Sequence, residues 1–277
     1  MSLHVIEGLV QGTEEWFAAR RGMVTASVVG KLLTVTAPGA LEYACPECDA
    51  VPIESCISLS RKSPSVIKVP HSGRAKVAAD NAATAKPIIK VADNDTSRAV
   101  TLTLVAERLS GFTDPSYVND DMMRGILHEP VARDRYAEHN KVEVRQVGFM
   151  VRDDLGGQLG ASPDGLVSTD GGIEVKCPRA KEHIRTIIAD EVPVQYMPQV
   201  QACLLVSGRE WWDFVSFCAG LPMYTKRVYP DPVWQNAITD AARAFEKRAD
   251  RIVDDYLTKS AGLPATERIA DDLEMVI

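Results

Sequence analysis

The sequence predicts an α/β fold in which a sheet is flanked by helices, with a small cysteine-containing module inserted after the first elements. Three observations predict it. Strand-like alternation recurs between residues 142 and 177, helical periodicity is found before residue 34 and after residue 96, and between those two limits it disappears. Because a structureless loop of that length is rare inside a compact domain, we expect the middle stretch to be a separate module.

The first helices are predicted on both sides of this module. Residues 16–21 form a short helix, and Thr25-Ala26-Ser27 supply a polar entry to a second helix that runs to residue 33. After the module, residues 97–111 carry an apolar stripe and end at a glycine, which is a common helix stop. A further helix covers residues 120–139.

The second half alternates strands and helices. Strands are expected where polar and apolar residues alternate, at 142–151, 158–162, 165–168, 172–177, 211–217 and 223–228. The turn sequence Thr169-Asp170-Gly171-Gly172 predicts a hairpin between the third and fourth of these strands. Helices are expected at 181–190, 194–206 and 231–256. The predicted division is therefore a core of 1–35 and 97–260, a module with a basic linker at 36–96, and a mobile tail at 261–277.

The composition is that of an ordinary globular protein. The 277 residues are 45% hydrophobic and 25% charged, which suffices for a large core without disulfides. The N-terminal segment lacks the features of a signal peptide, and no apolar run approaches the roughly 18 residues that a membrane helix needs. We therefore expect a soluble, intracellular protein. Its six cysteines are too few for a disulfide scaffold, so that a cluster among them indicates a metal site.

The charge is distributed unevenly. The net charge of −7 excludes a protein that binds polyanions through its total charge. Residues 57–92 nevertheless carry seven basic residues against the single acid Asp80, a local charge of +6. This asymmetry is typical of an acidic nuclease with a separate nucleic-acid contact, and it is equally compatible with a solvated linker.

The most informative string is Ser162-Pro163-Asp164-Gly165, followed by Glu174-Val175-Lys176. Side chains alternate along a strand, so Glu174 and Lys176 lie on one face and the hairpin brings Asp164 beside them. Two carboxylates and the Val175 carbonyl form a hard oxygen site suited to Mg²⁺, or to Mn²⁺ in its place. The ammonium group can then orient or deprotonate an attacking water. The same short pattern also occurs as a surface ion pair on a hairpin.

With these residues the chain resembles the phage lambda exonuclease-type viral recombinases, a branch of the PD-(D/E)xK nuclease superfamily. The matching segments, in order, are WFAARRGMVTAS, RGILHEPVARDRYAE, GASPDGLV, GGIEVKCP and YMPQVQACLLVSG. The resemblance covers about 11–35 and 97–258. It implies a restriction-endonuclease-like core with a central mixed sheet, and a Mg²⁺-dependent deoxyribonuclease that digests double-stranded DNA ends from 5′ to 3′ for recombination by strand annealing.

The resemblance also implies the surroundings of the protein. These are a single-strand annealing protein as partner, a ring-shaped homotrimer, and the cytoplasm of a bacterial host cell. A related endonuclease or a RecB-like nuclease of different polarity is the alternative that the catalytic motif alone does not separate. A zinc-containing DNA-binding protein without activity is a further alternative, and it would require a vestigial acidic cluster.

The resemblance assigns roles to residues outside the central motif. Glu129 matches an additional acidic residue near the metal, and Gln199 matches a helix glutamine near the catalytic lysine. Arg20, Ser27 and Ser162 match positions that hold the terminal 5′-phosphate. The forked guanidinium of Arg20, and the helix N-terminus near Ser27, both favour binding of an anion. Because Arg21 follows directly, the register of the arginine is open by one, and either arginine can instead be a solvated surface group. For Glu129 the alternative is a solvated helix carboxylate, and for Gln199 an amide bonded to backbone.

The module departs from the family. Cys45, Cys48, Cys56 and His71 form a C-x2-C…C…H set, and three thiolates with one imidazole are a standard tetrahedral shell for Zn²⁺. The text CPEC…PIESC…PHSGR resembles small zinc fingers of actinobacteriophage proteins. Such a shell is closed, so the expected zinc is structural. Three free cysteines in a disordered basic loop are the alternative. The remaining cysteines, 177, 203 and 218, are expected to be buried packing residues.

Overall fold

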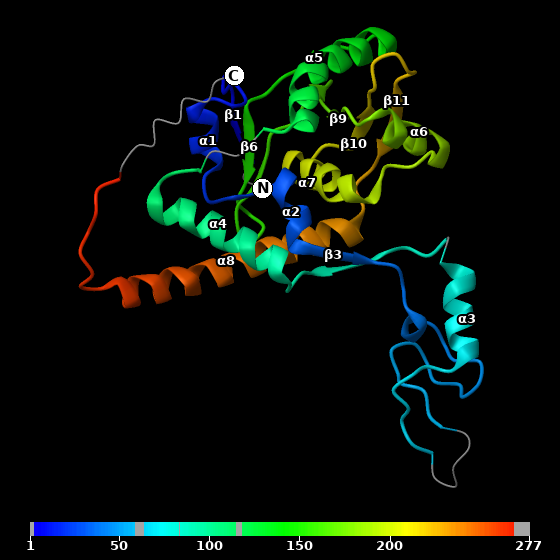
Figure 1. Ribbon diagram of the computed structural model, residues 1–277. Coiled ribbons are helices and arrows are strands. Elements are labelled where there is room, and N and C mark those ends of the chain that lie inside the picture. Colours follow the sequence, from blue (N-terminus) through cyan, green and yellow to red (C-terminus); the bar gives the residue numbers. More distant parts are fainter. Residues whose placement is uncertain (1–2, 59–63, 83, 115–117, 269–277) are drawn as a thin grey trace.

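The structure, a computed structural model, describes residues 3–58, 64–82, 84–114 and 118–268. Within these ranges two sheets pack against helix α7 (Met197–Ser207), and a two-stranded ribbon carries the module away from them (Figure 1). The α/β fold predicted from the sequence is confirmed. None of the helices in the described ranges is long and apolar enough to cross a membrane.

The larger sheet is mixed and contains the hairpin that the sequence predicts. Its order is β11-β10-β9-β8-β5, with the bounds β5 (Val144–Arg145), β8 (Gly165–Val167), β9 (Gly171–Lys176), β10 (Trp211–Ser216) and β11 (Tyr224–Val228). Strands β9 and β10 are parallel and the other pairs are antiparallel. Glycine is required at 171 and 172 because the rings of Trp211 and Trp212 lie where a Cβ would be.

The smaller sheet has the order β1-β6-β7-β2 and holds the N-terminal segment. Its strands are β1 (Leu3–Ile6), β2 (Val24–Thr25), β6 (Phe149–Arg152) and β7 (Leu159–Ala161). The single strand expected at 142–151 is therefore wrong, because β5 and β6 belong to different sheets. The chain changes sheets around Gly148, where a Cβ would collide with Leu9.

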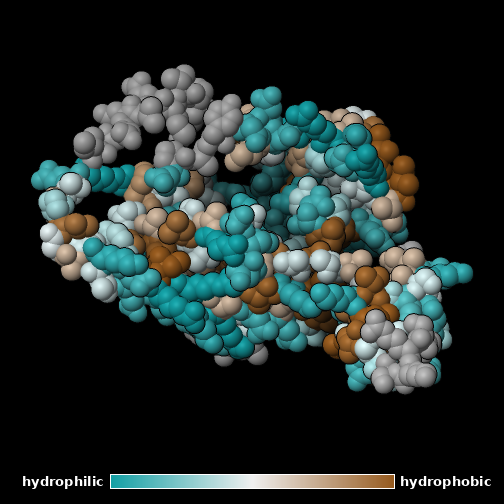
Figure 2. All heavy atoms as spheres, turned by 60° about the horizontal axis from the view of Figure 1, so that its bottom comes forward, coloured by the Kyte–Doolittle hydropathy of each residue, from teal (hydrophilic) through white to brown (hydrophobic). Residues whose placement is uncertain are grey.

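Helix α7 lies at the centre of the core, and the other helices cover the sheets. Val200, Ala202, Cys203 and Leu204 of α7 are all at most 1% exposed. The covering helices are α1 (Glu14–Arg20), α2 (Ala26–Val29), α4 (Asp95–Ser110), α5 (Asp120–Asn140), α6 (Ala180–Ala189) and α8 (Pro232–Ser260), with 3₁₀ turns η1 (Gly30–Leu32) and η3 (Val194–Tyr196). Figure 2 shows mainly hydrophilic residues along the outward face of α8, as an amphipathic helix requires.

The module follows a ribbon of two strands, β3 (Leu33–Thr36) and β4 (Ile88–Val91), which pair antiparallel with Thr36 opposite Ile88. Arg248 of α8 fixes the base of the ribbon by donating to the Ala92 carbonyl at 3.0 Å. Beyond it lie η2 (Ala40–Glu42) and helix α3 (Ser72–Asn81). Sequence periodicity missed α3, because no apolar stripe holds it in place and its one buried residue is Arg74.

The C-terminal segment after α8 is described only as far as residue 268. Of the tail predicted at 261–277, residues 269–277 lie outside the described residues. The same holds for Arg61 and Lys62 of the basic stretch. Within the described part of that stretch, Arg74 is fully buried and contributes no surface charge. The exposed cations that remain there are Lys68, Lys76, Lys86 and Lys90.

Candidate active site

Asp164, Glu174 and Lys176 converge at the β8–β9 hairpin, as their spacing predicts. Asp164 directly precedes β8, and its Oδ2 accepts a hydrogen bond from the Val175 backbone N–H at 2.6 Å. Glu174 and Lys176 project from the same face of β9, and the Lys176 Nζ donates to Glu174 Oε1 at 2.6 Å. Glu174 is 1% exposed and Asp164 8%. Two acids are thus held almost out of water beside one ammonium group.

One oxygen of this cluster has no partner. Within the described residues, Glu174 Oε2 is buried and accepts no hydrogen bond. An unsatisfied buried carboxylate oxygen is costly unless a cation or a proton meets it. The negative charges of Asp164 and Glu129 act on Glu174, and carboxylate oxygens are the donors that Mg²⁺ prefers. The residues present therefore fit a divalent cation.

The electrostatics of the cluster agree with this fit. Burial, and then the negative charge of Asp164, raise the pKa of Glu174 to about 8. Burial also raises the pKa of Asp164. For Lys176 burial opposes the charge, but Glu174 and Asp164 outweigh it and the pKa lies above its usual value. Without a cation, Glu174 therefore keeps its proton at neutral pH, where an exposed glutamate would be ionised.

Glu129 joins the cluster from helix α5. Its carboxylate lies 3.5 Å from the Arg133 guanidinium, and its side chain is 24% exposed. Burial, and then the charge of Asp164, raise the pKa of Glu129 to about 7, which shows that the two acids sense each other. The structure thus brings together the acids of two separate elements.

Gln199 lies on α7, whose N-terminal end approaches Lys176. The ring of Tyr196, three residues before Gln199, lies 5.6 Å from the Lys176 Nζ. Gln199 is half-buried. Gln201 serves a different purpose: it is fully buried, donates to the Tyr229 carbonyl at 2.9 Å and accepts from the Asp231 N–H at 3.0 Å.

Arg20, Ser27 and Ser162 form a second cluster. Arg20 Nη1 donates to Ser162 Oγ at 3.1 Å, and Nη2 donates to Ser27 Oγ at 3.1 Å. Trp16 completes it, since its indole N–H donates to Ser162 Oγ at 3.0 Å and its ring stacks 3.8 Å from Arg20 Cζ. Burial lowers the pKa of Arg20 to about 10. The three polar side chains predicted to share a site are in contact.

The neighbouring arginine points elsewhere. Arg21 donates to Glu14 Oε1 at 2.9 Å, and the Glu14 side chain is 72% exposed. Only Arg20 faces the two serines. Ser162 also lies two residues before Asp164 in the chain, so the Arg20 cluster and the carboxylate cluster are built on the same short segment.

Cys45, Cys48, Cys56 and His71 gather in the module. The ligand atoms of these four side chains lie within 4.8 Å of one another, and Cys45 Sγ is 3.4 Å from His71 Nδ1. All three cysteines are free thiols. This is the donor set and the grouping that a structural zinc ion requires.

Two family profiles match the chain, one over the carboxylate cluster and one over the module. Residues 73–210 match the profile of the YqaJ-like viral recombinase domain. The chain contains a YqaJ-like viral recombinase domain. Residues 11–88 match the profile described as "Putative DNA-binding phage zinc finger domain". No curated protein matches the chain significantly.

Solved structures support the same assignment. The alkaline exonuclease of Laribacter hongkongensis is 27% identical, with a TM-score of 0.65 over 91% of this chain and 100% of that one. Its complex with dAMP is 28% identical, with a TM-score of 0.64 over the same shares. A phage-related exonuclease of Haemophilus somnus shares the fold at 12% identity and a TM-score of 0.50, over 84% of this chain and 96% of that one. The recombinase domain is therefore that of a DNA-hydrolysing exonuclease, and the module is of the zinc-binding type.

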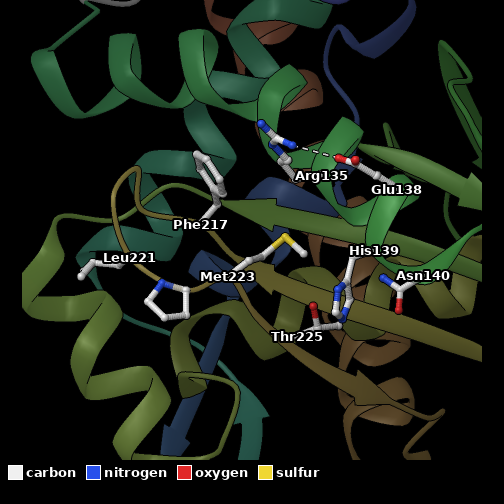
Figure 3. A pocket seen from close by; sticks show the side chains of 9 residues that line it. Arg135, Glu138, His139, Asn140, Phe217, Leu221, Met223 and Thr225 are labelled. Atoms are coloured by element: carbon white, nitrogen blue, oxygen red, sulfur yellow. Dashed lines mark hydrogen bonds and ion pairs between the residues drawn. The ribbon is translucent and has the colours of Figure 1, made fainter.

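A groove on the recombinase domain lies apart from the clusters. It is formed by the C-terminal end of α5, with Arg135 and His139, and by the β10–β11 connection, with Phe217 and Met223 (Figure 3). The Arg135 guanidinium there pairs with Glu138 at 2.9 Å. None of the site residues predicted from the sequence lines this groove.

Three residues to which the sequence assigns no role support the candidate sites. Trp16 is a buried residue and also contacts both Arg20 and Ser162. Arg133 and Arg74 lie on helices, and both are buried. A single sequence does not distinguish such arginines from solvated helix cations, and Arg133 even has Glu129 four residues before it, which is the spacing of an ordinary surface ion pair.

The expectation for the other cysteines is partly wrong. Cys203 on α7 is fully buried, as expected. Cys177 and Cys218 are only half-buried, because each follows the end of a strand where the chain turns towards the surface.

Proposed function

We propose that the protein is a Mg²⁺-dependent exonuclease that digests double-stranded DNA ends from 5′ to 3′, for recombination by strand annealing. The observation that carries the proposal is the position of the Arg20–Ser27–Ser162 cluster beside the carboxylates, through the segment Ser162–Asp164. A terminal 5′-phosphate held by the first cluster would place the adjacent phosphodiester at the second. That geometry suits stepwise removal of nucleotides from a 5′ end.

The residues divide the chemistry between them. Asp164, Glu174, Glu129 and the Val175 carbonyl would hold Mg²⁺, which supplies Lewis-acid activation of water and of the phosphate. Because its pKa is raised, Lys176 is positively charged at neutral pH and donates hydrogen bonds. It would orient or deprotonate the attacking water, and in its charged form it would stabilise negative charge on the phosphate oxygens.

Arg20 supplies specificity for the end. Its two nitrogens already point at two hydroxyl groups, so the fork is fixed before a phosphate arrives, and little side-chain entropy remains to be lost. Gln199, near the Lys176 end of α7, would contact the water or the scissile phosphate. The solved relative with bound dAMP supports a deoxynucleoside monophosphate as the released product.

The zinc module would add a DNA contact outside the active site. We propose that Zn²⁺ on Cys45, Cys48, Cys56 and His71 is structural, since four protein ligands leave no open position. The lysines on the module surface, 68, 76, 86 and 90, would bind phosphates of the duplex. An annealing protein and a ring-shaped homotrimer are part of the same proposal through the family resemblance. Mass measurement in solution tests the trimer.

The decisive experiment compares linear and closed circular duplex DNA. We expect digestion of linear DNA only, faster from 5′-phosphate than from 5′-hydroxyl ends, with mononucleotide products and none without Mg²⁺. Mg²⁺ is to be omitted by dialysis, because a chelator would also remove zinc. Cleavage of the circle would identify an endonuclease, and equal rates on both ends would refute the role of the Arg20 cluster.

A further inference from the structure

Arg133 is a buried guanidinium that links helix α5 to the segment carrying Asp164. Its residue surface is 9% exposed. Its Nη1 donates to the Asp164 main-chain carbonyl at 2.7 Å, and its Nη2 lies 3.5 Å from Glu129 Oε1. The side-chain amide of Gln146 lies beside the guanidinium, and in the amide orientation that satisfies both groups its oxygen accepts from Nη2 at 3.2 Å. One side chain therefore contacts two of the three acidic residues of the site.

A buried cation needs a reason, because removing a charge from water costs several kcal/mol unless good partners replace the water. Attachment of α5 to the sheet is not a sufficient reason. Tyr136, one turn further along α5, already provides it, since its hydroxyl donates to the buried Asp213 Oδ2 at 2.6 Å. Arg133 differs from Tyr136 in that its partners belong to the carboxylate cluster.

We infer that Arg133 is a positioning residue: it fixes Glu129 of α5 relative to Asp164 of the hairpin, and so sets the affinity of the site for Mg²⁺. This inference rests on the proposed function. The planar fork can hold a carbonyl and a carboxylate at once, which a single ammonium group cannot do in the same geometry. Groups that orient metal ligands commonly change metal affinity by about 10- to 100-fold.

The charge of Arg133 and its positioning role make opposite predictions. A positive charge near a cation site repels the cation, so that a charge effect alone would make Mg²⁺ binding tighter once the charge is removed. A positioning effect makes binding weaker whenever the fork is lost, even if the charge is kept. Arg133→Lys keeps the charge and loses the fork, and Arg133→Met loses both.

The test measures Mg²⁺ binding by isothermal titration calorimetry on the zinc-loaded full chain, together with thermal unfolding and DNA digestion. Tyr136→Phe is the matched control, because it removes a buried hydrogen bond to Asp213 from the same helix and leaves Asp164, Glu174 and Glu129 untouched. We expect Arg133→Lys and Arg133→Met to bind Mg²⁺ at least about tenfold more weakly and to need correspondingly more Mg²⁺ for turnover. Tyr136→Phe should lose thermal stability but keep the wild-type Mg²⁺ affinity.

The possible outcomes distinguish a failure of the positioning role of Arg133 from a failure of the proposed nuclease function. Wild-type Mg²⁺ affinity in folded Arg133→Lys, or tighter binding in Arg133→Met, would overturn the positioning role. Equal weakening in Tyr136→Phe would also overturn it, because the effect would then be general loosening of α5. A wild-type protein that binds no Mg²⁺ and digests no DNA would instead overturn the proposed function, whatever the variants do.

Discussion

Replacing Glu174 by glutamine tests the metal site through stability as well as turnover. The substitution keeps the shape of a buried side chain that is 1% exposed, and it removes the negative charge. The pKa of this carboxyl is about 8, against an ordinary value of 4.5. The native state therefore binds this proton more tightly than the unfolded chain does, and the metal-free protein should lose stability as the pH rises from about 4.5 to about 8.

The size of the effect follows from linkage. Each pKa unit corresponds to about 1.4 kcal/mol, so the ionisation of Glu174 costs the metal-free native state on the order of 4 kcal/mol by pH 8. For a chain of this size that amounts to roughly 10 °C in Tm. Glu174→Gln should not show this loss, and at pH 8 without Mg²⁺ it should be more stable than wild type. The slope that remains comes from Asp164 and Glu129, whose pKa values are also raised.

Thermal unfolding followed by tryptophan fluorescence is the assay, with the protein dialysed free of Mg²⁺ at several pH values. All four tryptophans, at 16, 211, 212 and 234, lie outside the module, so the signal reports on the nuclease core. Adding Mg²⁺ should stabilise wild type more at high pH, where no proton competes, and should stabilise the variant much less. Digestion of end-labelled duplex by the variant should fall by more than about a hundredfold.

Glu182→Gln is the control for this substitution. Glu182 lies on α6, its side chain is 55% exposed, and it pairs with Arg185 across one helical turn. Its replacement should change neither the pH dependence of Tm nor the rate of digestion. Parallel pH profiles of wild type and Glu174→Gln would refute the buried carboxylate as the source of the slope, and full activity in Glu174→Gln would refute its role as a metal ligand.

Three other predictions concern separate parts of the protein. Arg20→Ala should abolish the preference for 5′-phosphate over 5′-hydroxyl ends in a digestion assay. Arg21→Ala should keep that preference, because Arg21 pairs with Glu14 instead of the two serines. Lys176→Ala should reduce kcat by more than about a hundredfold while calorimetry still detects Mg²⁺ binding. Elemental analysis should find one zinc per chain. Cys48→Ser should release that zinc and expose residues 36–96 to protease, with the tryptophan-reported unfolding of the core unchanged.

Elements that form through contacts between residues near in sequence are easier to predict from the sequence than elements that depend on contacts with distant residues. The β8–β9 hairpin follows from its turn residues and from alternation, and β9 therefore places Glu174 and Lys176 on one face. Helix α3 could not be predicted in this way, because its buried residue is an arginine. Arg74 donates to the carbonyls of Tyr43, Glu54, Leu41 and Val51, and such a contact depends on the completed module.

The candidate sites likewise differ in whether their residues are close together in the sequence or are brought together by the fold. Residue type and spacing indicate Asp164, Glu174 and the four zinc ligands, because those chemistries require particular atoms at short sequence distances. The resemblance supplies Arg20 and Ser162, which are far apart in the chain, and their contact at 3.1 Å is a property of the fold. Arg133 is recognisable only once α5 and the hairpin are both in place. Its partners Glu129 and Asp164 come from different elements.

The ribbon of β3 and β4 is the place at which we expect the nuclease to be separable from its insertion. Thr36 and Ile88 are paired residues, so the chain returns beside the point from which it left, and we expect the core to fold without what lies between them. An Asn-Gly turn in place of residues 37–87 closes the same pair with the backbone twist that a hairpin favours. Such an excision would give a shorter enzyme with the same active site. In the opposite direction, the same splice point could accept a different binding module, so that end recognition and duplex binding would be exchangeable parts of one enzyme.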